Sequence, residues 1–164
     1  MSVYDDKVWR SHYRKQDLAP RNIEFDTALD MFAATAARTP DADLIRYFDG
    51  SITAGELDEL TDAFAVGILD LGFTPGDRAV IYAQNIPQFV IAQLGIWKAG
   101  GIAVSANPMY RSRELAEILV DSGATLLVAM QSLFRDVAQE ALRDNETAVR
   151  TVITTSELEY QTAN

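Results

Sequence analysis

The sequence predicts an α/β fold of the Rossmann-like type: a mostly parallel sheet with helices on both faces, in three layers, plus a short hairpin near the N-terminus. Three strand-like runs, "RAVIYAQ", "IAVSA" and "TLLVAM", show no regular polar alternation, which is typical of strands buried on both faces. The segments between them are long enough for the helical crossovers that parallel strands require. A chain of 164 residues, 48% of them hydrophobic, is long enough to bury one sizeable core.

Residues 1–24 mix aromatic and polar side chains and are expected to form an N-terminal arm, with Tyr4, Trp9 and Tyr13 as anchors on the domain of residues 25–164. The first helix of that domain is expected from Asp26, which can cap it, to Arg38. Pro40 then prevents the helix from continuing.

A hairpin and a long helix follow directly. Asp49-Gly50 lies between two short apolar runs, and Asp-Gly is a strong signal for a tight hairpin turn. Thr53 and Glu56 have the spacing of a capping box, and Gly72 stands where a helix C-terminus favours a residue without Cβ. The sequence therefore predicts a helix between Thr53 and Gly72.

The next helix is expected to be buried on most sides. Asn85 and Gln88 repeat the capping-box spacing around Pro87, and the helix continues to Ala99 with few polar residues. Gly100-Gly101 should then reverse the chain into the strand "IAVSA", which ends at Asn107-Pro108. Further helices are expected at residues 113–121 and around 134–142, and a last strand, "RTVIT", near residue 152.

Charge and composition exclude several classes of function. The net charge of −10 opposes nucleic-acid binding, and the sequence shows no local basic stripe. No apolar run approaches the roughly 20 residues of a membrane span, and the N-terminus does not resemble a secretory signal. The absence of cysteine excludes thiolate chemistry and fits a reducing compartment. We therefore expect a soluble, cytoplasmic protein.

No catalytic or metal-binding residue is predicted. No Gly-x-Gly-x-x-Gly motif follows a strand, so a dinucleotide site is disfavoured. His12 is the only histidine and has no neighbouring nucleophile and acid that could form a triad with it. The acidic residues Asp58, Glu59 and Asp62 are expected to form a solvated helix face.

A series of short motifs follows in a fixed order along the chain: Thr53, Glu56-Leu57, Gly76-Asp77-Arg78, Asn85, Ala99-Gly100-Gly101, Asn107-Pro108, Glu114-Leu115 and Asp121-Ser122. By these motifs the segment from about Leu29 to Thr154 resembles the N-terminal part of the adenylate-forming (AMP-binding) enzymes, which include acyl-CoA synthetases, luciferases and peptide-synthetase adenylation domains. "VWRSHYRK" and "NIPQF" are most similar to fatty-acid and long-chain acyl-CoA ligases. Ala54 differs from the aromatic residue common in the family.

This resemblance implies an acid–thiol ligase that joins a carboxylic or fatty acid to CoA through an acyl-adenylate, using ATP, CoA and Mg²⁺. It also implies that residues 25–164 are the N-terminal subdomain of the family's large domain, ending before the phosphate loop. We therefore expect this chain alone to be inactive and to bind no cofactor tightly. Its expected partners are the remainder of the large domain and the C-terminal domain, and exposure of the surface they cover would favour self-association.

The resemblance also implies a site for the nucleotide end of CoA, formed by Asn107, Pro108, Met109 and Tyr110 with Arg135. An arginine can bind a phosphate through two parallel hydrogen bonds. Two alternatives remain open at this stage: a stand-alone binding or interaction module without catalysis, and part of a peptide-synthetase adenylation domain. The residues specify neither acyl chain length nor the acceptor.

Overall fold

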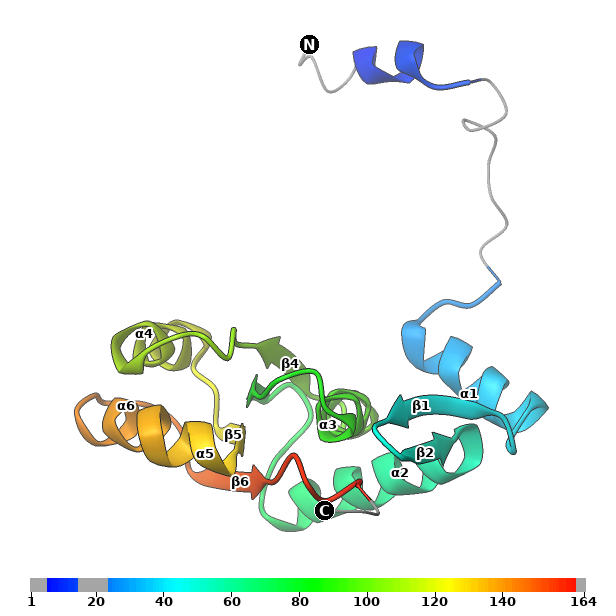
Figure 1. Ribbon diagram of the computed structural model, residues 1–164. Helices are drawn as coiled ribbons and strands as arrows, with labels where there is room; N and C mark the ends of the chain where they lie inside the picture. The colour runs from blue at the N-terminus through cyan, green and yellow to red at the C-terminus, as the bar shows by residue number, and fades with distance from the viewer. Residues whose placement is uncertain (1–5, 15–23, 162–164) are drawn as a thin grey trace.

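The computed structural model describes residues 6–14 and 24–161. Its elements alternate between strands and helices from residue 78 onward, as the sequence predicts. In chain order they are η1 (Val8–His12), α1 (Ala28–Arg38), β1 (Asp43–Tyr47), β2 (Gly50–Thr53), α2 (Ala54–Asp70), β3 (Arg78–Tyr82), α3 (Pro87–Lys98), β4 (Ile102–Ser105), α4 (Ser112–Ser122), β5 (Leu126–Met130), α5 (Gln131–Leu133), η3 (Phe134–Ala138), α6 (Gln139–Arg143) and β6 (Thr151–Thr155) (Figure 1).

The main sheet has four strands in the order β4-β3-β5-β6, and every pairing is parallel. Val80 at the centre of β3 is opposite Val104 of β4 on one side and Leu127 of β5 on the other. The chain leaves β3 toward β4 and leaves β5 toward β6, in opposite directions. The carboxyl ends of β3 and β5 therefore form the switch point at which open α/β sheets generally bind ligands.

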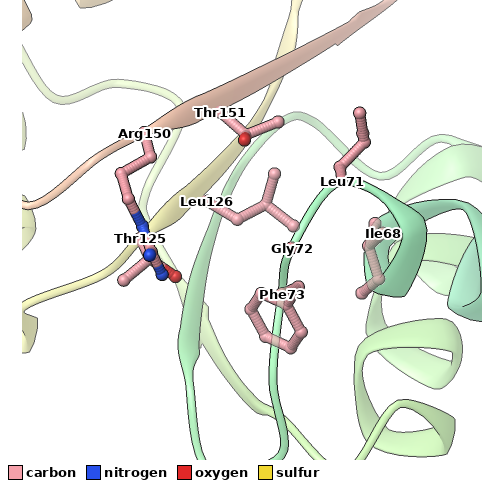
Figure 2. A pocket seen from close by; sticks show the side chains of 8 residues that line it. All are labelled: Ile68, Leu71, Gly72, Phe73, Thr125, Leu126, Arg150 and Thr151. Atoms are coloured by element: carbon pink, nitrogen blue, oxygen red, sulfur yellow. The ribbon is translucent and has the colours of Figure 1, made fainter.

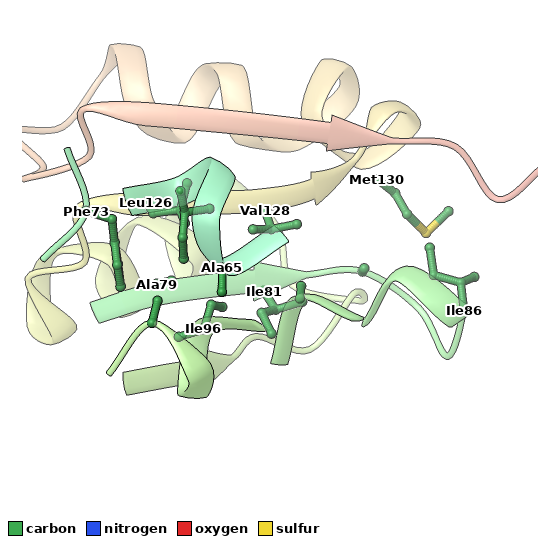
Figure 3. Packing of buried hydrophobic residues seen from close by; sticks show 13 residues of the cluster. Ala65, Phe73, Ala79, Ile81, Ile86, Ile96, Leu126, Val128 and Met130 are labelled. Atoms are coloured by element: carbon green, nitrogen blue, oxygen red, sulfur yellow. The ribbon is translucent and has the colours of Figure 1, made fainter. Parts of the chain in front are cut away.

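Each face of the sheet is covered by helices, which confirms the predicted three layers. Ala79 and Ile81 of β3 join one core cluster with residues of α2 and α3, as Figure 3 shows. Val80 and Tyr82, the alternate residues of the same strand, join a second cluster with residues of α4, η3 and α6. Both sets are buried because successive side chains of a strand point to opposite faces.

A third cluster connects the N-terminal elements to the domain. β1 and β2 form the predicted hairpin, but Tyr47 pairs with Gly50, so the turn residues are Phe48 and Asp49 and not Asp49-Gly50 as predicted. The hairpin and α1 lie beside α2 and α3 (Figure 1). Buried side chains from these elements pack together: Phe32, Ile52, Leu57, Ile91 and Leu94. The long face of α3 is thus covered from two directions, as its composition predicts.

The helix caps agree only partly with the prediction. Thr53 and Glu56 form a capping box, but α1 is capped by Thr27 with Asp30 and not by Asp26. Ile86 occupies the N-cap position of α3 without a side-chain cap, so the predicted role of Asn85 is wrong. The Gln88 side chain bonds to residues after β6 instead, because that segment crosses the start of α3.

The two adjacent glycines perform the predicted reversal after α3. Gly100 has φ of +75°, a conformation that L side chains rarely adopt. A Cβ on Gly101 would meet the Phe73 ring at 2.4 Å, so this position needs glycine for space. The hydrogen bond from Gly76 N to Gly100 O, at 2.9 Å, joins this reversal to the turn before β3.

The aromatic residues of the N-terminal segment are not buried in the part that the structure describes. η1 buries no residue, and Trp9 and Tyr13 are 42% and 57% exposed. Their predicted role as buried anchors is therefore wrong for the described residues, while Tyr4 lies outside them. Within residues 6–14 and 24–161, no helix has the length and apolar character to cross a membrane.

Candidate functional site

The turn after β4 is fixed to the end of β3 by one buried tyrosine. The Tyr82 hydroxyl donates a hydrogen bond to the carbonyl oxygen of Tyr110 at 2.6 Å, and the Pro108 carbonyl oxygen lies 3.5 Å away. Tyr82 has no exposed surface. The turn of residues 107–110 is thus held against the carboxyl edge of the sheet.

Internal hydrogen bonds define the shape of this turn. The Met109 amide donates to Asn107 Oδ1 and the Tyr110 amide donates to the Asn107 carbonyl, both at 2.9 Å. Asx turns of this kind are a normal use of asparagine. Met109 at the tip remains 80% exposed. The turn therefore presents an apolar side chain to solvent on a constrained backbone.

Burial keeps the Tyr82 hydroxyl protonated, so that it can donate a hydrogen bond. It raises the pKa of Tyr82 above its ordinary value of 10.0, and the nearby carboxylate of Glu114 raises it further. At neutral pH the hydroxyl is therefore protonated. Its hydrogen bond to Tyr110 is consequently present throughout the physiological pH range.

Arg135 lies on η3, the π-helical middle of the segment between β5 and β6. Its side chain is exposed and has no ion pair or hydrogen bond among the described residues. Its neighbour Phe134 packs against the second core cluster, as does Tyr110. The structure thus places the turn and η3 around one cluster, but no described contact joins Arg135 to the turn.

A second polar group at this edge was not predicted from the sequence. The buried Gln88 donates through Nε2 to the Ser156 carbonyl at 2.7 Å and to Glu159 Oε2 at 3.0 Å. Thr155 Oγ1 donates to the same carboxylate oxygen at 2.6 Å. The sequence signal was masked because Gln88 follows Asn85 at capping-box spacing. Together these bonds tie the chain leaving β6 to the start of α3.

The same hydrogen bonds control the ionisation of Glu159. Partial burial by itself would raise the pKa of this carboxyl, but the bonds from Thr155, Gln88 and the Ser156 amide outweigh that effect and lower it. Gln88 Oε1 is buried and has no hydrogen-bond partner among the described residues. The group as a whole is therefore most stable with Glu159 ionised.

A small, partly open cavity lies at the opposite edge of the sheet, near the amino ends of β5 and β6 (Figure 2). Its volume is about 20 Å³, enough for one water molecule. Thr125 Oγ1, one of the lining groups, is buried without a partner in the described chain. A site of this size cannot hold a substrate, so the cavity is structural. The lining residues are Ile68, Leu71, Gly72, Phe73, Thr125, Leu126, Arg150 and Thr151.

The sequence predicted no catalytic or metal-binding residues. No group of three His, Cys, Asp or Glu residues in the described ranges could hold a metal ion. The acidic residues of α2 are not simply a solvated face, because Asp58 and Asp62 both bind Lys98. The side chains of Asp58 and Asp62 are nevertheless 40% and 67% exposed, so the predicted solvated face is present and the ion pairs with Lys98 are an addition to it.

Comparison with protein-family models identifies the chain. The model described as "AMP-binding enzyme" matches residues 32–164. The chain belongs to this family. The family resemblance predicted from the short matches between residues 53 and 122 is thereby confirmed, and so is the fold class.

Individual AMP-binding relatives agree with this assignment. The long-chain-fatty-acid–CoA ligase of Escherichia coli O6:H1 is 33% identical over 151 residues, which are 91% of this chain and 26% of that protein. The crystal structure of a long-chain-fatty-acid-CoA ligase from Archaeoglobus fulgidus has a TM-score of 0.71 at 26% identity, covering 86% of this chain and 31% of that one. The chain thus spans about a quarter of the length of the curated relative.

The peptide-synthetase alternative fits the comparisons less well. An artificially fused adenylation–PCP di-domain NRPS from Klebsiella oxytoca has a TM-score of 0.66 at 24% identity, covering 77% of this chain and 22% of that one. At this identity the likeness shows the fold alone. The acyl-CoA ligases match more of the chain at higher identity.

Proposed function

We propose that residues 25–164 are the N-terminal subdomain of the large domain of an ATP-dependent fatty acid or carboxylate–CoA ligase in the cytoplasm, preceded by the arm of residues 1–24. The observation that supports this most strongly is the 33% identity to a long-chain-fatty-acid–CoA ligase over 91% of the chain. The complete enzyme forms an acyl-adenylate from ATP and a carboxylic acid with Mg²⁺, and then the CoA thioester. The remainder of the large domain and the C-terminal domain are its partners.

The 164-residue chain alone is proposed to be inactive. Adenylation requires hydrogen-bond donors and a metal ion around the α-phosphate, where charge develops in the transition state. We expect pyrophosphate exchange by residues 1–164 to equal the buffer blank. Exchange above that level, abolished by boiling the protein, contradicts the proposal.

Within the enzyme, this subdomain is proposed to bind the nucleotide end of CoA at Asn107, Pro108, Met109, Tyr110 and Arg135. The chemical types of these side chains suit such a ligand. The exposed Met109 side chain can contact an adenine ring, and the exposed guanidinium of Arg135 can bind a phosphate. The chain supplies binding and orientation here, while the thiol chemistry belongs to CoA.

The site can be tested by titrating CoA and 3′-dephospho-CoA into the ¹⁵N-labelled chain. We expect shifts at Met109, Tyr110 and Arg135, and tighter binding of CoA because of its additional phosphate. Arg135→Gln should remove this preference. Arg113→Gln is the matched control, since the Arg113 side chain is 90% exposed on α4. Shifts confined to other residues, or equal loss in both variants, contradict the site.

Self-association is proposed through the C-terminal half of α2. Three apolar side chains at the end of α2 are exposed: Val66 at 57% and Leu69 at 41% within the helix, and Leu71, its C-cap residue, at 59%. Such a group on one helix is a candidate for association. Light scattering should show a mass that rises with concentration and falls after Leu69→Lys. A monomer at every concentration contradicts this.

A further inference from the structure

We propose that Tyr82 is a positioning residue for CoA, acting through the turn of residues 107–110. This inference rests on the CoA site proposed above. Tyr82 itself lies beneath the turn with no exposed surface, so it acts without touching the ligand. Its hydroxyl donates to the Tyr110 carbonyl, 28 residues further along the chain, and the Pro108 carbonyl lies 3.5 Å away.

The position of the Tyr82 backbone is set by the centre of the sheet. Tyr82 ends β3 and is opposite Ala129 of β5, while the preceding residue, Ile81, is opposite Ser105 of β4. The Ala106 amide donates to the Ile81 carbonyl at 2.9 Å, extending the β3–β4 pairing to the start of the turn. The backbone that carries the Tyr82 ring is therefore held in place by both neighbouring strands.

Packing then fixes the ring. Tyr82 belongs to the second core cluster, where Leu115 and Ala116 of α4 and Ala138 of η3 are also buried. The ring consequently contributes to the cluster around which η3, the helix bearing Arg135, is packed. The turn and η3 thus both pack against the same buried group of side chains.

Packing of the ring does not by itself explain the hydroxyl. A phenylalanine would fill nearly the same space, whereas a buried hydroxyl costs free energy unless it is hydrogen-bonded. The distance of 2.6 Å to the Tyr110 oxygen is short for an O–H···O bond. The bonds that the Met109 and Tyr110 amides donate to Asn107 fix the shape of the turn. The Tyr82 bond fixes the position of the turn on the sheet.

The test is Tyr82→Phe in the 164-residue chain, with CoA and 3′-dephospho-CoA as probes. Loss of the bond leaves the turn free to shift, and the affinity for both probes should fall about tenfold, the effect of roughly one buried hydrogen bond. The ratio between the two affinities should stay unchanged, in contrast to Arg135→Gln. Hydrogen exchange at the Met109 and Tyr110 amides should become faster.

The matched control is Tyr160→Phe, which removes a hydroxyl from a partly buried tyrosine beside the hairpin. It should leave CoA affinity and exchange at Met109 unchanged. Circular dichroism should show all variants fully folded at the temperature of the titration. A purely structural role of Tyr82 then predicts a lower thermal stability with unaltered CoA affinity.

The two levels of the proposal fail differently. If the wild-type chain binds CoA and Tyr82→Phe binds it equally well, the positioning role of Tyr82 is wrong while the CoA site stands. If the wild-type chain does not bind CoA, the CoA site is wrong, and Tyr82 has no ligand to position.

Discussion

Lys98 Nζ lies 2.6 Å from Asp58 Oδ1, and this ion pair joins the end of α3 to the first half of α2. Asp62 Oδ1 also lies 2.6 Å from Lys98 Nζ, and the Phe32 ring centroid is 5.6 Å from it. The Lys98 side chain is only 17% exposed. Burial alone would lower its pKa, but the bonds to the two carboxylates outweigh this and raise it. The charged form is therefore the one the fold selects.

Lys98→Met should destabilise the chain by about 1–2 kcal/mol, between the values for exposed and buried ion pairs. The substitution keeps an unbranched apolar side chain of similar length near Phe32 and removes only the charge. Urea unfolding measures the difference. Arg113→Met is the control, since it breaks the exposed Arg113–Glu117 pair and should cost no more than about 0.5 kcal/mol. Equal costs for the two variants would show that the Lys98 pair is not special.

Gly101→Ala should destabilise the chain by about 1–3 kcal/mol, because the new Cβ overlaps the Phe73 ring in the first core cluster. Gly67→Ala should have the opposite sign. A Cβ there meets nothing within 4 Å, and Gly67 lies inside α2, where alanine is favoured by about 0.5–1 kcal/mol. Thermal unfolding of both variants distinguishes the two effects. A stabilising Gly101→Ala would contradict the close approach of Phe73.

The bonds around Glu159 should lose strength in acid. The pKa of Glu159 is lowered in the folded chain, so its contribution to stability is full above the ordinary value of 4.5 and is lost as the pH falls through the folded value. The stability difference between the wild type and Glu159→Gln should therefore shrink below pH 4.5. Unfolding measured at several pH values tests this. A difference that stays constant across that range rules out the mechanism.

Ionisation of Tyr82 should lower the stability of the folded chain at alkaline pH. Its pKa is raised in the folded chain, so the unfolded chain releases the proton first and stability falls as the pH rises above 10.0. Tyr82→Phe should make this decline shallower. Denaturation at pH values on both sides of 10.0 provides the measurement, with Tyr160→Phe showing the contribution of the other tyrosine whose pKa is raised. An equally steep decline in Tyr82→Phe contradicts the assignment.

The layered fold could be predicted because its signals are local. Uninterrupted apolar strands, the capping box at Thr53 and the reversal at Gly100-Gly101 each depend on neighbours in the sequence, and each is present in the structure. The caps at Thr27 and Ile86 were missed for a different reason. Several residues near a helix start can cap it, and the choice depends on the backbone that enters the helix.

The contacts that organise the candidate site are long-range, and no local pattern marks them. Tyr82 reads as one more apolar residue of a buried strand, yet its hydroxyl fixes a turn beyond the next strand. Gln88 reads as a capping residue, yet it binds a segment 68 and 71 residues away. Sequence spacing reports helix faces and turns well, but which side chains meet at a sheet edge depends on the strand order.

The strand order also bears on how the chain assembles as it is made. β3 can pair with β4 after a single helix, but its other edge must wait until two helices and β4 have passed and β5 arrives. Until then an apolar strand has an unsatisfied backbone edge, and such edges recruit other chains. Long-range parallel pairing of this kind forms slowly. Release of β5 from the ribosome is thus the step at which β3 gains its second neighbour, and β5 in turn keeps an open edge until β6 follows.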